Sequence, residues 1–318
     1  MNRHDRRVSS SSAGTTACLA SGAAFGAMGI FGKLAYGEGA TVGTLLSVRF
    51  TLAAALFWAL LLAGGGIGRA RALPRRDLAA ALALGAVGYA LQAGCYFAAL
   101  TRIDASLLAL VLYTFPALVA GASVALGRER IDARRLTALG LALAGLALVV
   151  AGAGAGALDP VGTALGLGAA VVYSGYILAG QAVAARVPGP VLTGLVCSGA
   201  AASLTAGSAV LGDLRPGDVT VAGWGWLVGL VVVSTVIAIG LFFAGLSRVG
   251  PTNAAILATV EPLVTALLAF AVFGERLGAV QIAGAAFIIV AVLVLQTRQL
   301  NRRPRVAIPG PLTERTTA

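Results

Sequence analysis

The sequence is poor in the side chains that enzyme and metal sites use. Its 318 residues include a single histidine, His4, and three cysteines, Cys18, Cys95 and Cys197, which show no C-x-x-C spacing. This set predicts neither a disulfide framework nor a metal site. The apolar part of the chain also lacks histidine, paired carboxylates and a nucleophile with a base nearby, so we expect neither enzyme chemistry nor a bound cofactor.

Charged residues are scarce as well, and their scarcity predicts the surroundings of the chain. Only 11% of the residues are charged against 58% that are hydrophobic, and the mean hydropathy of +0.93 excludes a water-soluble domain of ordinary composition. An apolar run of about 18 residues or more can cross a hydrocarbon core of about 30 Å as a helix. Ten runs approach or exceed that length, at 15–36, 42–63, 78–100, 105–126, 136–153, 161–183, 191–211, 221–246, 252–273 and 278–297. The expected fold is an all-α membrane protein with ten transmembrane helices.

The charges that are present are mostly arginines, and their placement is uneven. The net charge is +11, yet eighteen arginines fall in the tails and in the loops of one side, against three, Arg102, Arg215 and Arg276, in the loops of the other. This bias predicts a multi-pass protein of the cell (plasma or inner) membrane with both termini in the cytoplasm. We therefore expect the basic segments to contact membrane lipid and not nucleic acid.

The same five-helix pattern occurs twice in the chain. A shift of 146 residues aligns 96–130 with 242–276 without a gap and places Pro116 on Pro262 and Glu129 on Glu275. Because five is an odd number, the second copy must enter the membrane from the opposite side, and the two repeats are inverted. Inverted repeats are a recurrent plan of secondary transporters, whose substrate site lies near the midplane between the copies.

The repeat also predicts the domain boundaries. We expect a cytoplasmic tail at 1–14, a first five-helix repeat at 15–153, a second at 161–297 and a basic cytoplasmic tail at 298–318. The first run follows a basic opening as in a signal peptide, but it is too long for one. Its removal would also leave an odd number of helices, so we expect it to be retained.

Several short motifs resemble one known family. The motifs are YTFP at Tyr113–Pro116, VEP at Val260–Pro262, and GRERI and FGERLG before the last run of each half. Together with the five-plus-five repeat they resemble the drug/metabolite transporter (DMT) superfamily, in particular its EamA-type ten-helix exporters, over essentially the whole chain. The resemblance implies a secondary transporter that exports a small metabolite such as an amino acid. The first run departs from the family pattern, because SGAAFGAMGIFGK lacks the tryptophan-glycine often found there.

Three ionisable side chains, Glu261, Arg49 and Lys33, fall inside the apolar runs. A charge at the bilayer centre costs at least about 2.5 kcal/mol, so each is a candidate functional residue. Glu261 lies near the middle of its run, where it is either a proton-linked or substrate-contacting acid or a protonated group that hydrogen-bonds between helices. Arg49 and Lys33 lie nearer the helix ends. They either extend to the lipid headgroups or face the cavity and hold a carboxylate of the substrate.

Other polar residues within the runs are candidates for lining a cavity, or, for the tyrosines, for anchoring a helix at the membrane interface. These candidates are Gln92, Tyr96, Tyr113, Tyr173 and Tyr176. Gln92 and Tyr96 are four residues apart and therefore share one helical face.

Two prolines and two glutamate-arginine turns occupy matching positions in the halves. Pro116 and Pro262 are either paired hinges or plain kinks. We interpret the turns at Glu129 and Glu275 as structural, since an acid there can favour the N-terminus of the next helix. The leading hypothesis is a transporter of a small-molecule substrate that works by alternating access as a monomer or homodimer, with proton coupling left open. The alternative is a membrane sensor or scaffold that has kept the fold without transport.

Overall fold

Every described element of the chain is helical. The structure, a computed structural model, describes residues 3–127, 132–152, 159–249, 254 and 257–300, and no strand occurs in these ranges. Eight helical segments in them are long and apolar enough to cross a membrane, and two shorter apolar helices, Val260–Phe273 and Ala279–Leu295, bring the number to ten. The predicted all-α fold with ten transmembrane helices is confirmed.

Several of the ten spans consist of more than one helical element. In chain order the spans are α1 (Arg3–Gly26) with α2 (Met28–Gly37); α3 (Val42–Ala63); α5 (Arg75–Ala83) with η1 (Leu84–Tyr89) and α6 (Ala90–Leu100); α7 (Ala105–Leu112) with α8 (Phe115–Ala125); α9 (Ala133–Gly152); α10 (Pro160–Ala184); α11 (Gly189–Val210); α12 (Val221–Val231) with η3 (Val232–Ile237) and α13 (Ala238–Val249); α15 (Val260–Phe273); and α16 (Ala279–Leu300). Two short helices, α4 (Ile67–Arg71) and η2 (Pro216–Asp218), lie in connections. The ninth predicted run begins at 252, and its residues 252, 253, 255 and 256 lie outside the described ranges.

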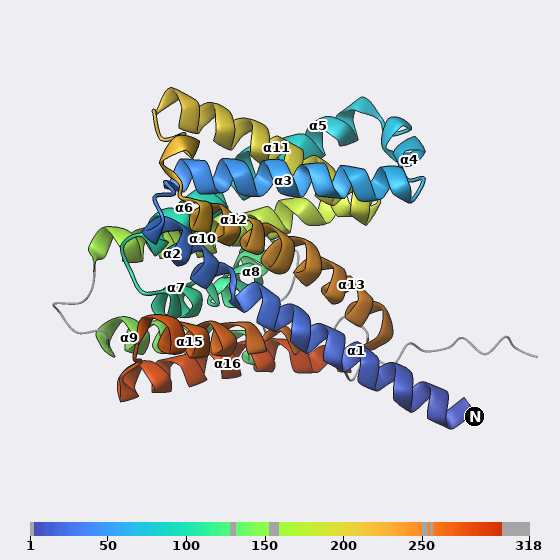
Figure 1. Ribbon diagram of the computed structural model, residues 1–318. Helices are drawn as coiled ribbons and strands as arrows, with labels where there is room; N and C mark the ends of the chain where they lie inside the picture. Colours follow the sequence, from blue (N-terminus) through green and yellow to red (C-terminus); the bar gives the residue numbers. More distant parts are fainter. Residues whose placement is uncertain (1–2, 128–131, 153–158, 250–253, 255–256, 301–318) are drawn as a thin grey trace, which may run out of the picture.

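Helix pairing follows the symmetry of an inverted repeat. The second span packs along the seventh (α3 on α11) and the fifth along the tenth (α9 on α16), so each of these pairs joins equivalent spans of the two halves. The first span packs on the eighth (α1 on α13), and its counterpart is the contact of the sixth with the third (α10 on α6). Figure 1 shows α3 lying along α11 and α1 running beside α13. The duplicated halves therefore pack against each other through contacts that occur in equivalent pairs.

Glycines allow the pair α9 and α16 to approach closely. A Cβ atom at Gly145 would lie 2.7 Å from the carbonyl oxygen of Gly284, and one at Gly284 would lie 2.6 Å from that of Gly145. Helices in lipid gain little from hydrophobic burial against each other, so this backbone contact supplies the dispersion energy that holds the pair.

One end of the bundle, which carries the connections 38–41, 101–104, 211–220 and 274–278, is closed by polar contacts and by packing. The Gly43 amide donates to the Asp213 carboxylate at 2.7 Å, and the Thr220 amide donates to the Glu38 carbonyl at 3.1 Å. All eight residues of α7 are buried there, whereas only Ala117 and Ser123 are buried in α8, the other half of the same span. We call this end the closed face and the opposite end, where α1 begins, the N-terminal face.

Within the described ranges, three of the spans are interrupted near mid-depth. Span one turns at Ala27, span four turns at Tyr113 and Thr114, and span nine turns at Thr259. The shift of 146 residues places Tyr113 on Thr259, so the last two interruptions are equivalent in the repeat. Pro116 and Pro262 follow them in the first turn of α8 and α15, where a missing N–H costs little. The prolines therefore mark the restart of a helix after a break.

The third and eighth spans each contain a π-helical segment. These are η1 and η3, and η1 moved by 146 residues would cover 230–235, two residues from the observed Val232–Ile237. A π segment has i→i+5 hydrogen bonds in place of i→i+4 bonds, which widens the helix locally, and such segments are frequent at functional sites. Both halves therefore place irregular helix at the same depth of the bundle.

Candidate functional site

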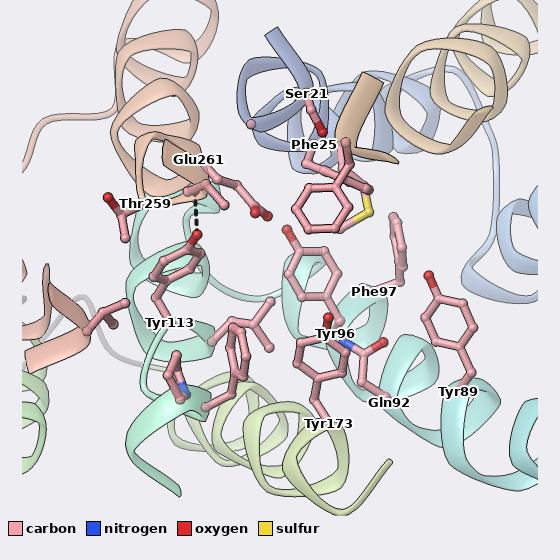
Figure 2. A pocket seen from close by; sticks show the side chains of 18 of the residues that line it. Ser21, Phe25, Tyr89, Gln92, Tyr96, Phe97, Tyr113, Tyr173, Thr259 and Glu261 are labelled. Carbon is pink, nitrogen blue, oxygen red and sulfur yellow. Dashed lines mark hydrogen bonds between the residues drawn. The ribbon is translucent and has the colours of Figure 1, made fainter. Parts of the chain in front are cut away.

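A cavity of about 430 Å³ lies among the interrupted helices. Both halves of the chain line it, which is where the inverted repeat predicted a site. Seven of the predicted residues lie in its wall: Arg49, Gln92, Tyr96, Tyr113, Pro116, Tyr173 and Glu261. Figure 2 shows the side chains of most of these residues directed toward a common space.

Glu261 enters the cavity from the first turn of α15, directly after the break at Thr259. The N-terminal end of a helix carries partial positive charge, so this position favours a carboxylate. Span one passes close by, since a Cβ atom at Gly26 would lie 2.8 Å from the Glu261 carbonyl oxygen. The carboxylate points toward the hydroxyl of Tyr96 (Figure 2) and forms neither an ion pair nor a hydrogen bond with any residue that the structure describes. An acid held in this way is accessible to a solute or a proton.

Arg49 reaches the cavity from α3 and is the other charged side chain among the described residues of its wall. The residue is 4% exposed, and its guanidinium lies 5.2 Å from the ring centre of Phe50 and 5.4 Å from that of Phe97. Its Nε atom is buried without a hydrogen-bond partner, and no acid in the described ranges pairs with it. Ring contacts stabilise a cation only in part, by about 2 kcal/mol when desolvated. Arg49 is therefore buried in the wall of the cavity and lacks a counter-ion among the described residues.

Aromatic rings form much of the remaining wall. Phe115 packs edge-on to Tyr173 with ring centres 4.7 Å apart, and Phe50 packs edge-on to Tyr89 at 5.0 Å. Tyr176 stacks on Tyr89 at 5.4 Å and stands behind the wall instead of in it. The cavity thus offers flat apolar surface between one cation and one acid.

Hydrogen bonds tie the three helix breaks to one another. The Tyr113 hydroxyl donates to the Ala258 carbonyl at 2.6 Å, which links the breaks of spans four and nine (Figure 2). The Thr265 hydroxyl donates to the Gly26 carbonyl at 2.9 Å, which links span nine to the break in span one. Carbonyl groups released at a break need such donors, because no water is present in a bilayer core.

Lys33 lies outside the cavity, at the closed face. Its Nζ atom is 2.7 Å from a carboxylate oxygen of Glu275 and 3.6 Å from one of Asp104. Glu275 also accepts hydrogen bonds from the amides of Ala105 and Ser106 at 3.1 and 3.0 Å, and from the Ser106 hydroxyl at 2.8 Å. The sequence suggested that this acid favours the next helix, α16, but the structure places it on the N-terminus of α7. Its counterpart Glu129 lies outside the described residues.

The hydrogen bonds decide the protonation of Glu275. Burial works to raise the pKa of this carboxyl, but hydrogen bonds from Lys33 and from Ser106 outweigh it, and the pKa lies below its usual range. The Glu275 carboxyl is therefore ionised at neutral pH.

Sequence reasoning missed part of the cavity wall. The residues it did not select include Ser21, Phe25, Tyr89, Phe97, Phe115 and Phe242. Tyr89 had a readable signal, because it precedes Gln92 and Tyr96 by three and seven residues and therefore lies on the same helical face. The phenylalanines had none, since a sequence alone does not separate a phenylalanine that faces a cavity from one that faces lipid.

This arrangement, two inverted five-helix halves around a cavity with charged groups and interrupted helices, is that of a membrane transporter and not of an enzyme. The EamA-like transporter family model matches the chain twice, at residues 12–151 and 160–297. The chain therefore belongs to the EamA-like transporter family, as the YTFP and VEP motifs predicted.

Known proteins similar to this chain agree with that assignment. An uncharacterized transporter of Archaeoglobus fulgidus is 32% identical over 205 residues, which cover 64% of this chain and 72% of that protein. The uncharacterized transporter YcbK of Bacillus subtilis is 27% identical over 305 residues, covering 93% and 96%. A solved crystal structure with 23% identity shares the fold with a TM-score of 0.62, over 91% of this chain and 99% of the other.

Proposed function

We propose that this protein exports a small amphipathic metabolite, an amino acid or a related compound, by alternating access. One observation carries the proposal: among the described residues, Arg49 and Glu261 are the only charged side chains in the cavity wall, and no described residue neutralises either of them. Isolated charges in a membrane interior are costly and indicate a role in function. A solute that carries both an anionic and a cationic group would neutralise both.

The chemistry of the cavity wall fits such a solute. The planar guanidinium of Arg49 can hold a carboxylate through two parallel hydrogen bonds. Glu261 can accept an ammonium group or carry a proton in its place, and the rings of Tyr173 and Phe115 can cover an apolar body. Protonation of Glu261 would also remove the cost of moving a bare carboxylate through an apolar passage, which is the basis for proton coupling.

The proposed orientation gives the transport its direction. With both termini in the cytoplasm and repeats at 15–153 and 161–297, the closed face would be external and the cavity would be reached from the N-terminal, cytoplasmic face. A substrate would then enter from the cytoplasm and leave when the closed face opens. This geometry suits export.

A flux assay in proteoliposomes tests the proposal. The protein should exchange labelled amino acids from a mixture and accumulate one class of them when a pH gradient is imposed. In Glu261→Gln, pH-driven accumulation should be lost while exchange persists, because exchange does not require release of a proton in each cycle. The exposed acid variant Asp218→Asn is the matched control and should behave as the wild type. Full accumulation by Glu261→Gln would exclude the proton carrier, and absence of flux for every solute would favour a sensor or scaffold.

A further inference from the structure

The contact between Lys33 and Glu275 differs from the other ion pairs at the closed face. Side-chain exposure is 21% for Lys33 and 5% for Glu275, against 46% and 33% for Arg102 and Asp159, a pair at the same face. Exposed ion pairs contribute little, about 0 to 1 kcal/mol, whereas removal of one member of a buried pair is strongly destabilising. The two pairs therefore provide a strong and a weak contact for comparison.

The position of Glu275 also joins moving parts. Its carboxylate binds Lys33 of α2 and the first amides of α7, which belong to the first half, while Glu275 itself follows α15 of the second half. Helix α2 begins at the break in span one, and α7 ends at the break in span four. Glu261 enters the cavity from the opposite end of α15. Separation of α15 from α7 at the closed face would break the three contacts of Glu275 with Ala105 and Ser106, and separation of α15 from α2 would break the fourth, with Lys33.

We propose that Lys33, Glu275 and the N-terminus of α7 form a latch that holds the closed face shut in the transport cycle. Opening strips the Glu275 carboxylate of an ammonium, two amides and a hydroxyl, and these charge-assisted bonds favour the closed conformation. Because the pKa of Glu275 lies below its usual range, its carboxylate stays ionised at neutral pH. An acid with a lowered pKa stabilises the closed conformation when it is ionised. This stabilisation is therefore present above the ordinary pKa range of glutamate and is lost only as the pH falls below that range. Among the described residues, Lys33 is the charged group that contacts Glu275. Asp104 lies 3.6 Å from the Lys33 ammonium and is 63% exposed, so it is the weaker acid partner of Lys33.

Cysteine accessibility tests the latch without a substrate, so its outcome is independent of the proposed function. Met28→Cys places a thiol in the cavity wall between the break of span one and Lys33. A membrane-impermeant maleimide is applied from the face at which Asp218→Cys reacts, which is the closed face. Reaction of Met28→Cys should be slow in the otherwise unchanged protein, because the closed face blocks access.

In the latch variants this reaction should accelerate. With Glu275→Gln or Lys33→Met added, the labelling rate should rise about tenfold or more, as expected when hydrogen bonds to charged groups are lost from one of two conformations. Lys33→Arg should restore slow labelling, and Arg102→Gln, which removes only the exposed pair, should leave the rate unchanged. Equal rates in Lys33→Met and Arg102→Gln would overturn the proposal. Lys33→Met leaves the cap on α7 intact, so it decides the question if Glu275→Gln does not fold.

Discussion

Arg49 and Lys33 looked alike in the sequence and have opposite surroundings in the structure. Each lies toward one end of its span, so each was expected either to reach the headgroups or to face the cavity. Lys33 reaches an acid at the closed face, while Arg49 points inward to the rings of Phe50 and Phe97 and to a hydrogen bond with the Tyr89 side chain. The difference lies in tertiary neighbours: Glu275 comes from a distant part of the chain to meet Lys33, and no described acid meets Arg49. A buried cation without a counter-ion among the described residues is the stronger indication of an anionic ligand.

Replacement of Arg49 tests that reading at the level of one residue. Arg49→Lys keeps the charge but loses the planar fork, so we expect the KM for transport to rise about tenfold with a smaller change in maximal rate. Arg49→Met should lose substrate binding while the protein still inserts, because it keeps much of the apolar volume. Initial-rate transport at graded substrate concentration measures both. An unchanged KM in Arg49→Met would remove Arg49 from the binding site.

The part of the cavity wall that consists of polar side chains could be predicted from the sequence. Glu261, Gln92 and Tyr96 were identified because a polar group inside an apolar run needs a reason to be there. Phe97 and Phe242 were not, since apolar side chains face lipid, core and cavity alike in such a protein. Tyr176 shows the reverse error of the same argument, because its polar group lies behind the wall, against Tyr89.

At the scale of helices, the irregular segments position the site. Breaks in spans one, four and nine and the π segment η1 bring side chains of different depth to one cavity. The sequence predicted two of these points through Pro116 and Pro262, although the turns at Thr114 and Thr259 fall two and three residues before the respective proline. The break at Ala27 and the π segments carry no proline and could not be predicted. They depend on packing between the halves and on donors such as Ser21, whose hydroxyl binds the Ala238 carbonyl at 2.7 Å.

The hydrogen bond from Thr265 to Gly26 should stabilise the break in span one. Thr265→Val is nearly isosteric and removes the hydroxyl, which leaves a buried carbonyl without this donor at a cost of about 1 to 3 kcal/mol. We expect the thermal unfolding midpoint in detergent to fall by a few degrees. Thr137→Val removes a comparable hydroxyl that bonds within the exposed surface of α9 and serves as the control. If both variants unfold at the same temperature, the hydrogen bond at the break contributes nothing measurable.

At the scale of the whole molecule, the inverted repeat explains why the helix pairs are symmetric, although only one end of the bundle is closed. The contacts of α3 with α11 and of α9 with α16 obey the two-fold relation that the duplicated sequence predicted. The two ends of the bundle differ, however, because α7 at the closed face is buried throughout, whereas α8, the other part of the same span, is buried only at Ala117 and Ser123. Two equivalent halves in unequal environments can exchange those environments, and such an exchange would present the cavity to the other side of the membrane. Only the chain pattern was readable from the sequence; which face is closed depends on contacts such as that of Glu275.

Labelling of two exposed loop positions tests the orientation of the whole molecule in the membrane. Arg76 has a side chain that is 80% exposed at the N-terminal face, and Asp218 is exposed at the closed face. The arginine bias predicts that Arg76→Cys is cytoplasmic and Asp218→Cys external. An impermeant maleimide should therefore label Asp218→Cys in intact cells and Arg76→Cys only after permeabilisation. The wild type is the control, because Cys18 and Cys197 are each 2% exposed and Cys95 lies within a span. Labelling of Arg76→Cys in intact cells would show that the molecule has the opposite orientation in the membrane. The cavity would then open outward, which would favour uptake over export.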